Sequence, residues 1–88
     1  MNELQQKAIN SARTVLFNDC GYSTDAITTD KMFIVWFCKT LQNWKAIVSG
    51  YEVKELLEVT YNGDRGETYV DIYEKKVNVC LQDESTAL

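Results

Sequence analysis

Residues 55–73 read ELLEVTYNGDRGETYVDIY, and this stretch decides the fold. Leu57, Val59 and Tyr61 alternate with polar residues, which is the period of a strand with one buried face. The turn at 62–66 contains an Asn-Gly pair, which tolerates positive φ at two successive positions. The residues after this turn alternate again. The stretch therefore predicts an antiparallel β-hairpin.

Upstream of this hairpin the sequence predicts a second one. Residues 31–38 are apolar on both faces and rich in aromatic and branched side chains, which favours a central strand covered on two sides. A turn at 39–43 leads into a strand at 44–48. We expect both tryptophans of this region, Trp36 and Trp44, to pack in the core rather than to stack on nucleic acid, because the surrounding sequence is acidic.

The chain ends differ in their patterns. Residues 2–17 carry apolar side chains at helical spacing, which predicts an amphipathic helix with one stripe. The stripe consists of Leu4, Ala8, Ile9, Ala12, Val15 and Leu16. Gly21 follows and suits a left-handed helix end. Near the other end, alternation at Val77, Val79 and Leu81 favours a strand that resumes as far as Leu81, and the polar stretch 82–88 is expected to be frayed.

One helix followed by strands in hairpins must bury a helical stripe and one face of a sheet. The economical solution is a single α+β domain over residues 1–88. In it the N-terminal helix packs on one face of a four- to five-stranded antiparallel sheet.

Composition excludes several classes of function. The 88 residues include 13 acidic and 9 basic side chains, giving a net charge of -4, and no histidine. Imidazole chemistry is excluded, and bulk attraction to nucleic acid or anionic lipid is not expected. No local pattern pairs a nucleophile with an activating base, so we expect no enzymatic activity. No stretch is apolar enough to span a membrane, and residues 1–6 do not resemble a secretory signal, so the cytoplasm is the expected compartment.

The three cysteines, Cys20, Cys38 and Cys80, cannot form a closed disulfide framework within one chain. Cys38 and Cys80 lie in strand-like apolar runs, where free cysteine behaves as a small core hydrophobe. Cys20 lies in a polar loop. If the fold gathers the three thiolates, they would form a tetrahedral zinc site together with Asp19 or Asp25. We expect plain thiols and no cofactor, with zinc as the alternative.

Acidic residues are concentrated between positions 52 and 74. Seven acids oppose Lys54 and Arg65 there, so the segment carries -5, whereas the rest of the chain carries +1. The acids are Glu52, Glu55, Glu58, Asp64, Glu67, Asp71 and Glu74. They form either a solvated hairpin that resists aggregation or, with Tyr61, Tyr69 and Tyr73 as anchors, a surface that docks on a basic protein.

Two stretches resemble a known family. Residues 35–46, VWFCKTLQNWKA, resemble the motif VWxCKTLQNxKA of small uncharacterised proteins from phages and prophages of Gram-positive bacteria. Residues 58–73 resemble the EVTYNGD…YxDxYKK stretch of the same family. Trp44 stands where members often have His, so any chemistry of that His is missing here. The region 49–57 also departs from the family pattern.

This resemblance implies a phage accessory protein that acts in the cytoplasm of a bacterial host. Small acidic phage proteins include anti-CRISPR inhibitors of type II-A effectors, and such effectors hold nucleic acid in a basic channel. The resulting hypothesis is a non-enzymatic inhibitor that binds a basic surface of a host nucleic-acid-handling protein. The expected target is Cas9, whose DNA loading it would block without touching nucleic acid itself. The alternative is a small-molecule sponge or a zinc-dependent regulator.

Overall fold

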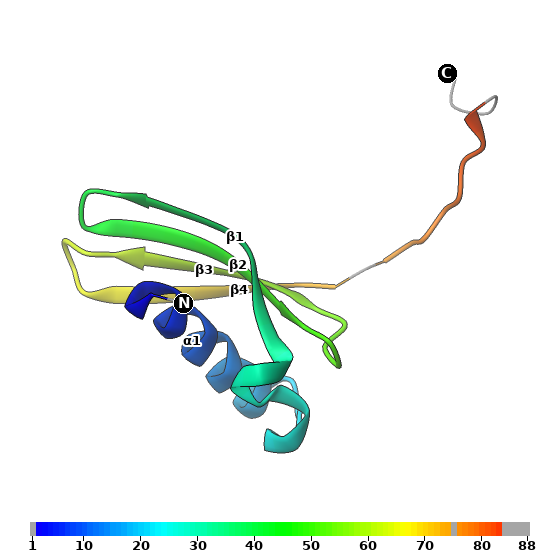
Figure 1. Ribbon diagram of the computed structural model, residues 1–88, viewed down its shortest axis with the longest axis horizontal. Helices are drawn as coiled ribbons and strands as arrows, with labels where there is room; N and C mark the ends of the chain where they lie inside the picture. Colours follow the sequence, from blue (N-terminus) through cyan, green and yellow to red (C-terminus); the bar gives the residue numbers. More distant parts are fainter. Residues whose placement is uncertain (1, 75, 84–88) are drawn as a thin grey trace.

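The structure is a computed structural model that describes residues 2–74 and 76–83. Within them the chain forms one α-helix, two short 3-10 helices and four strands. These elements are α1 (Glu3–Asp19), η1 (Thr24–Ile27), η2 (Thr29–Lys31), β1 (Met32–Thr40), β2 (Asn43–Gly50), β3 (Leu56–Asn62) and β4 (Glu67–Tyr73). The strands form one antiparallel sheet in the order β1-β2-β3-β4, and α1 packs across one face of it (Figure 1). The predicted α+β class is confirmed.

Helix α1 has defined ends. At its start the Asn2 side chain accepts a hydrogen bond from the backbone N–H of Gln5 at 2.8 Å. At its end Gly21 has a φ of 76°, the left-handed conformation that commonly ends a helix, and the N–H of Tyr22 donates to the carbonyl of Leu16 in the last turn at 3.1 Å. Among the described residues no helix is long and apolar enough to cross a membrane.

The core lies between α1 and the two central strands. Four members of the predicted helical stripe are buried, namely Ala8, Ile9, Ala12 and Leu16. Opposite them, Ala46 and Val48 of β2 pair in register with Val59 and Leu57 of β3, and all four are fully buried. Trp44 is also buried, as predicted. The alternation seen in the sequence therefore fixes which sheet face α1 covers.

Strand β1 differs from its prediction. It forms an edge of the sheet rather than a central strand, and its side chains at Val35 and Trp36 are 54% and 50% exposed. The pairing with β2 also shifts between Ile34 and Trp36, which marks a β-bulge. The prediction that Trp36 is a core residue is wrong, because Trp36 pairs with Ile47 and points to the sheet face that α1 does not cover, whereas Met32 of the same strand is buried.

The segment after β4 does not resume as a strand. Residues 76–82 have no regular secondary structure, and Val77, Val79 and Leu81 are exposed. This segment, drawn in orange, runs away from the sheet (Figure 1). The strand predicted as far as Leu81 is therefore absent from the single chain. Most of the predicted frayed end at 82–88, namely residues 84–88, lies outside the described residues.

The tips of the two hairpins touch each other. The backbone N–H of Gly63 donates to the side chain of Asn43 at 2.8 Å, and the Gln42 amide donates to Asp64. A Cβ at Gly63 would lie 2.7 Å from the Cβ of Gln42 and closer still to its backbone oxygen. The positive φ in the β3–β4 turn falls at Gly66, not at the Asn-Gly pair. Gly63 thus permits close approach of the other hairpin, and its predicted role as a positive-φ turn residue is wrong.

Candidate partner-binding surface

The face of the sheet that points away from α1 is left uncovered by the described residues. Strand register places two rows of side chains across it. One row is Trp36, Ile47, Glu58 and Asp71, and the next is Cys38, Lys45, Thr60 and Tyr69. We call this surface the open face. It comprises these two rows together with Leu56, Glu67 and Tyr73.

Large side chains stand exposed along both margins of the open face. Trp36 projects from β1, and Tyr69 and Tyr73 project from β4, each about half exposed. Leu56 pairs with Tyr73 and is also exposed. Scattered apolar side chains are ordinary on a protein surface, but aromatic residues gathered on one flat face are typical of a protein interface. The open face therefore offers contact area beyond what the fold uses.

Acidic side chains occupy the β3–β4 half of the open face. Glu58 and Asp71 lie directly opposite each other, an arrangement that costs about 0.2–1 kcal/mol in a sheet. The ammonium of Lys45 is 3.8 Å from the Glu58 carboxylate, so it compensates part of this charge. Glu67 accepts a hydrogen bond from the Tyr69 hydroxyl at 2.9 Å, which raises the pKa of Tyr69. The guanidinium of Arg65 lies 3.9 Å from the Glu67 carboxylate, so this half of the face carries three acids against two nearby bases and is weakly negative.

Two of the predicted partner-binding residues, the acid Glu55 and the anchor Tyr61, lie elsewhere. Glu55 is buried and accepts a 2.6 Å hydrogen bond from the hydroxyl of Tyr22. Tyr61 points to the covered face, where its ring stacks on Trp44 at 5.6 Å under the ammonium of Lys7. The prediction of one surface is therefore wrong for these two residues. For Tyr61 the signal was present in the sequence, because it alternates in phase with the buried Leu57.

Three further acids lie around the ends of the sheet rather than on its face. Glu52 follows β2 and forms an ion pair with Lys31 at 2.7 Å. Asp64 lies at the hairpin tip, where it accepts from Gln42. Glu74 directly follows β4 and is exposed. The structure thus gathers Glu58, Glu67, Asp71, Tyr69 and Tyr73 from the ten predicted partner-binding residues.

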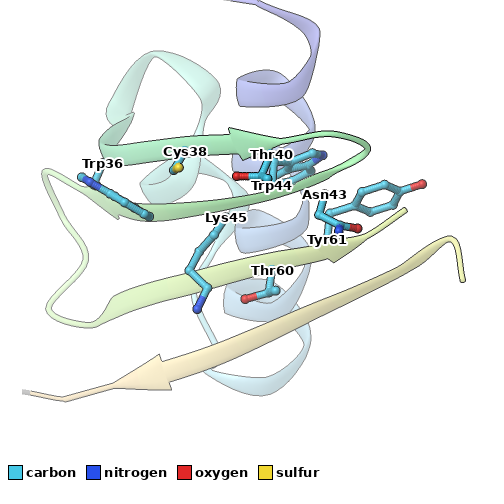
Figure 2. Close-up of a pocket in the computed structure, with 8 residues that line it drawn as sticks. All are labelled: Trp36, Cys38, Thr40, Asn43, Trp44, Lys45, Thr60 and Tyr61. Carbon is cyan, nitrogen blue, oxygen red and sulfur yellow. The ribbon is translucent and has the colours of Figure 1, made fainter. Parts of the chain in front are cut away.

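A shallow hollow lies at the β1–β2 side of the sheet and extends toward the hairpin tips. It has a volume of about 230 Å³, below the range of pockets that enclose a drug-sized ligand. Figure 2 shows Trp36 and Tyr61 at its two ends, with Lys45 and Thr60 between them. The indole N–H of Trp44, which also lines it, is buried and has no hydrogen-bond partner in the described part of the chain. Sequence reasoning missed the contribution of Trp36.

The three thiols lie in three separate places. Cys20 packs against the core just after α1, where burial and then the charge of Glu55 raise its pKa. Cys38 is exposed on the open face, and Cys80 is exposed in the segment after β4. The prediction that these last two are core residues is wrong, because Cys38 lies on the uncovered face of the sheet and Cys80 lies in a segment that pairs with no strand in the described residues. Residues 2–74 and 76–83 contain no group of His, Cys, Asp or Glu placed to hold a metal, and the zinc site stays a prediction.

The fold and this surface define a small α+β domain with a covered sheet face and an acidic, aromatic open one. The chain belongs to DUF6275, a family of unknown function whose model matches residues 3–83. The match includes α1, the four strands and the segment that follows β4. No curated protein matches the chain, and no solved structure does.

Proposed function

We propose that this chain is a non-enzymatic binding protein that docks its open face on a basic surface of a partner protein. The observation that carries the proposal is the row of the open face in which a half-buried Glu58 lies beside an exposed Asp71, with an exposed Trp36 at its other end. Carboxylates steer a basic partner into an encounter, and exposed aromatic rings supply contact area once it has formed.

The energetics of the sheet support this assignment. The covered face supplies the core, so the side chains of the open face are free of that constraint. Two opposed carboxylates lower the stability of a sheet, whereas a basic partner would remove their mutual repulsion. Burying the Tyr69 and Tyr73 rings costs little side-chain entropy compared with long flexible side chains. These properties favour recognition over simple solvation.

As the partner we propose a Cas9-type effector in the cytoplasm of a bacterial host. Such an effector holds nucleic acid in a strongly basic channel, which is complementary to the negative half of the open face. Occupation of that channel would block DNA loading. The motif resemblance to phage proteins supports this choice of host and target, and the charge complementarity supports the mode of binding.

The test is charge reversal on the open face. The triple variant Glu58→Lys, Glu67→Lys, Asp71→Lys should bind a guide-loaded type II-A Cas9 at least tenfold more weakly than the wild type at ~0.15 M salt. Fluorescence anisotropy of the labelled chain measures the affinity, and circular dichroism checks the fold. Undiminished affinity in a folded variant would exclude the open face, and a wild type that does not bind would exclude this effector.

A matched control separates local from global charge. Glu3, Asp19 and Asp25 are exposed and lie on α1 and η1, on the other side of the sheet. Their reversal to Lys changes the net charge as much as the open-face reversal does. If the open face is the contact surface, this control variant keeps nearly wild-type affinity, because its charges are screened from the partner.

A further inference from the structure

Two segments of the chain have a composition that does not match their surroundings. Strand β1 is apolar from Met32 to Cys38, as expected of a central strand, yet its outer edge is unpaired among the described residues. Val77, Val79 and Leu81 alternate like a strand, yet they are 71%, 66% and 62% exposed. The bulge between Ile34 and Trp36 interrupts the β1 edge, but an apolar edge strand is still a site where another strand can add. Strand β1 offers an unpaired edge, and residues 76–82 offer a strand-like sequence that pairs with no edge in the described part of the chain.

The segment 76–82 is part of the family's domain rather than an appendage, because the family model matches the chain as far as residue 83. Its alternation puts Val77, Val79 and Leu81 on one side and Asn78 and Cys80 on the other. A strand of this pattern buries one row of side chains when it pairs with an edge. In the single chain three large apolar side chains stay in water, so the free energy that their burial would contribute is not obtained.

The segment cannot reach the β1 edge of its own chain. It begins after β4, at the opposite edge of the sheet. A strand added beyond β1 would lie four strand spacings from β4, or ~19 Å. Four extended residue steps from Tyr73 to Val77 span at most ~14 Å. If residues 76–82 pair with a β1 edge, that edge must therefore belong to another copy.

We propose that the chain forms a two-fold symmetric dimer in which residues 76–82 of each copy add as a fifth strand to the outer edge of β1 in the other. Backbone hydrogen bonds between residues 76–82 of one copy and β1 of the other stabilise the dimer, as in β-strand addition to a sheet edge. Reciprocal exchange closes the assembly at two copies, whereas one-way exchange would propagate into open chains. The dimer covers β1 and leaves the β3–β4 half of the open face free.

The mass of the protein in solution tests the proposal. Multi-angle light scattering on the wild-type chain should give twice the chain mass of 10.1 kDa at micromolar concentration. The variant Val77→Asp, Val79→Asp should be monomeric, because it places charges on the row that becomes buried. Both positions are exposed in the single chain, so the variant retains its fold. The matched control Asn78→Asp places a charge on the other side of the same segment and should remain dimeric.

Hydrogen exchange shows which edge is used. Amides of β1 should exchange at least tenfold more slowly in the wild type than in the Val77→Asp, Val79→Asp variant, while those of β4 should be unchanged. A monomeric wild type overturns the proposal, including a monomer in which the segment folds back on its own β4 edge. A dimer whose protection lies in β4 overturns the assignment to β1, and larger, concentration-dependent species overturn the closed exchange.

Discussion

Leu56 and Leu57 are neighbours in the sequence and lie on opposite faces of β3. Leu57 is completely buried under α1, whereas Leu56 is 41% exposed on the open face beside Tyr73. The same residue type therefore meets two environments separated by one step along a strand. The comparison shows that the side chains of the covered face form the core. The side chains of the open face are not needed for the core, so their composition can serve binding.

The largest difference between the faces should come from truncating these two leucines. Leu57→Ala leaves a cavity under α1 and should lower the free energy of unfolding by about 3 kcal/mol. Leu56→Ala removes a half-exposed side chain and should cost less than about 1 kcal/mol. Urea unfolding followed by tryptophan fluorescence measures both. Equal losses of unfolding free energy in the two variants would mean that Leu56 is also buried in solution. The dimer proposed above does not bury Leu56.

The hairpin tips offer a second comparison, between two glycines of one turn. Gly63→Ala forces the β3–β4 tip away from the backbone of Gln42 and should cost about 1–3 kcal/mol. Gly66→Ala meets open space but must keep a positive φ, so its cost should be about 1 kcal/mol. Both are read from urea midpoints. A larger loss at Gly66 would show that turn conformation, not tip contact, governs this end of the sheet.

These comparisons also show how far the sequence alone can lead. The alternation of Leu57, Val59 and Tyr61 with Glu58 predicts both the strand and its buried face. Local pattern cannot report the number of neighbours that a strand has, so the apolar β1 looked central although it lies at an edge. The candidate site could not be predicted in full for the same reason. Glu58 and Asp71 are 13 positions apart in the sequence and become neighbours only because β3 pairs with β4 in this register. Burial of Glu55 depends on Tyr22, which is 33 residues away.

The buried contact of Glu55 gives a prediction with a pH signature. Tyr22→Phe removes the hydroxyl that donates to this carboxylate and should cost about 1–2 kcal/mol at pH 7. Burial, and then the hydrogen bond to Glu55, raises the pKa of Tyr22 above its ordinary 10.0. The folded state therefore holds this proton more tightly than the unfolded state does. The resulting stability is complete below pH 10 and is lost as pH rises through the folded pKa.

Unfolding curves at several pH values check this sign. The difference between wild type and Tyr22→Phe should be constant from about pH 7 to 9 and shrink above pH 10. The control is Tyr51→Phe, since Tyr51 is largely exposed and should show a small difference at every pH. A Tyr22→Phe difference that grows with rising pH would contradict the assigned direction of the pKa shift.

The smallest expected effect concerns the paired carboxylates of the open face. Asp71→Lys replaces a like-charge pair with an opposite-charge pair across β3 and β4, so it should stabilise the chain by about 0.5–1 kcal/mol. Asp71→Asn removes the repulsion without adding attraction and should give about half of that gain. The gain from Asp71→Lys should diminish at ~1 M salt, where exposed charges are screened. A folded chain that becomes more stable when an acid is removed keeps that acid for a purpose other than folding. Loss of stability in both variants would instead make Asp71 part of the fold and take away the energetic argument for recognition.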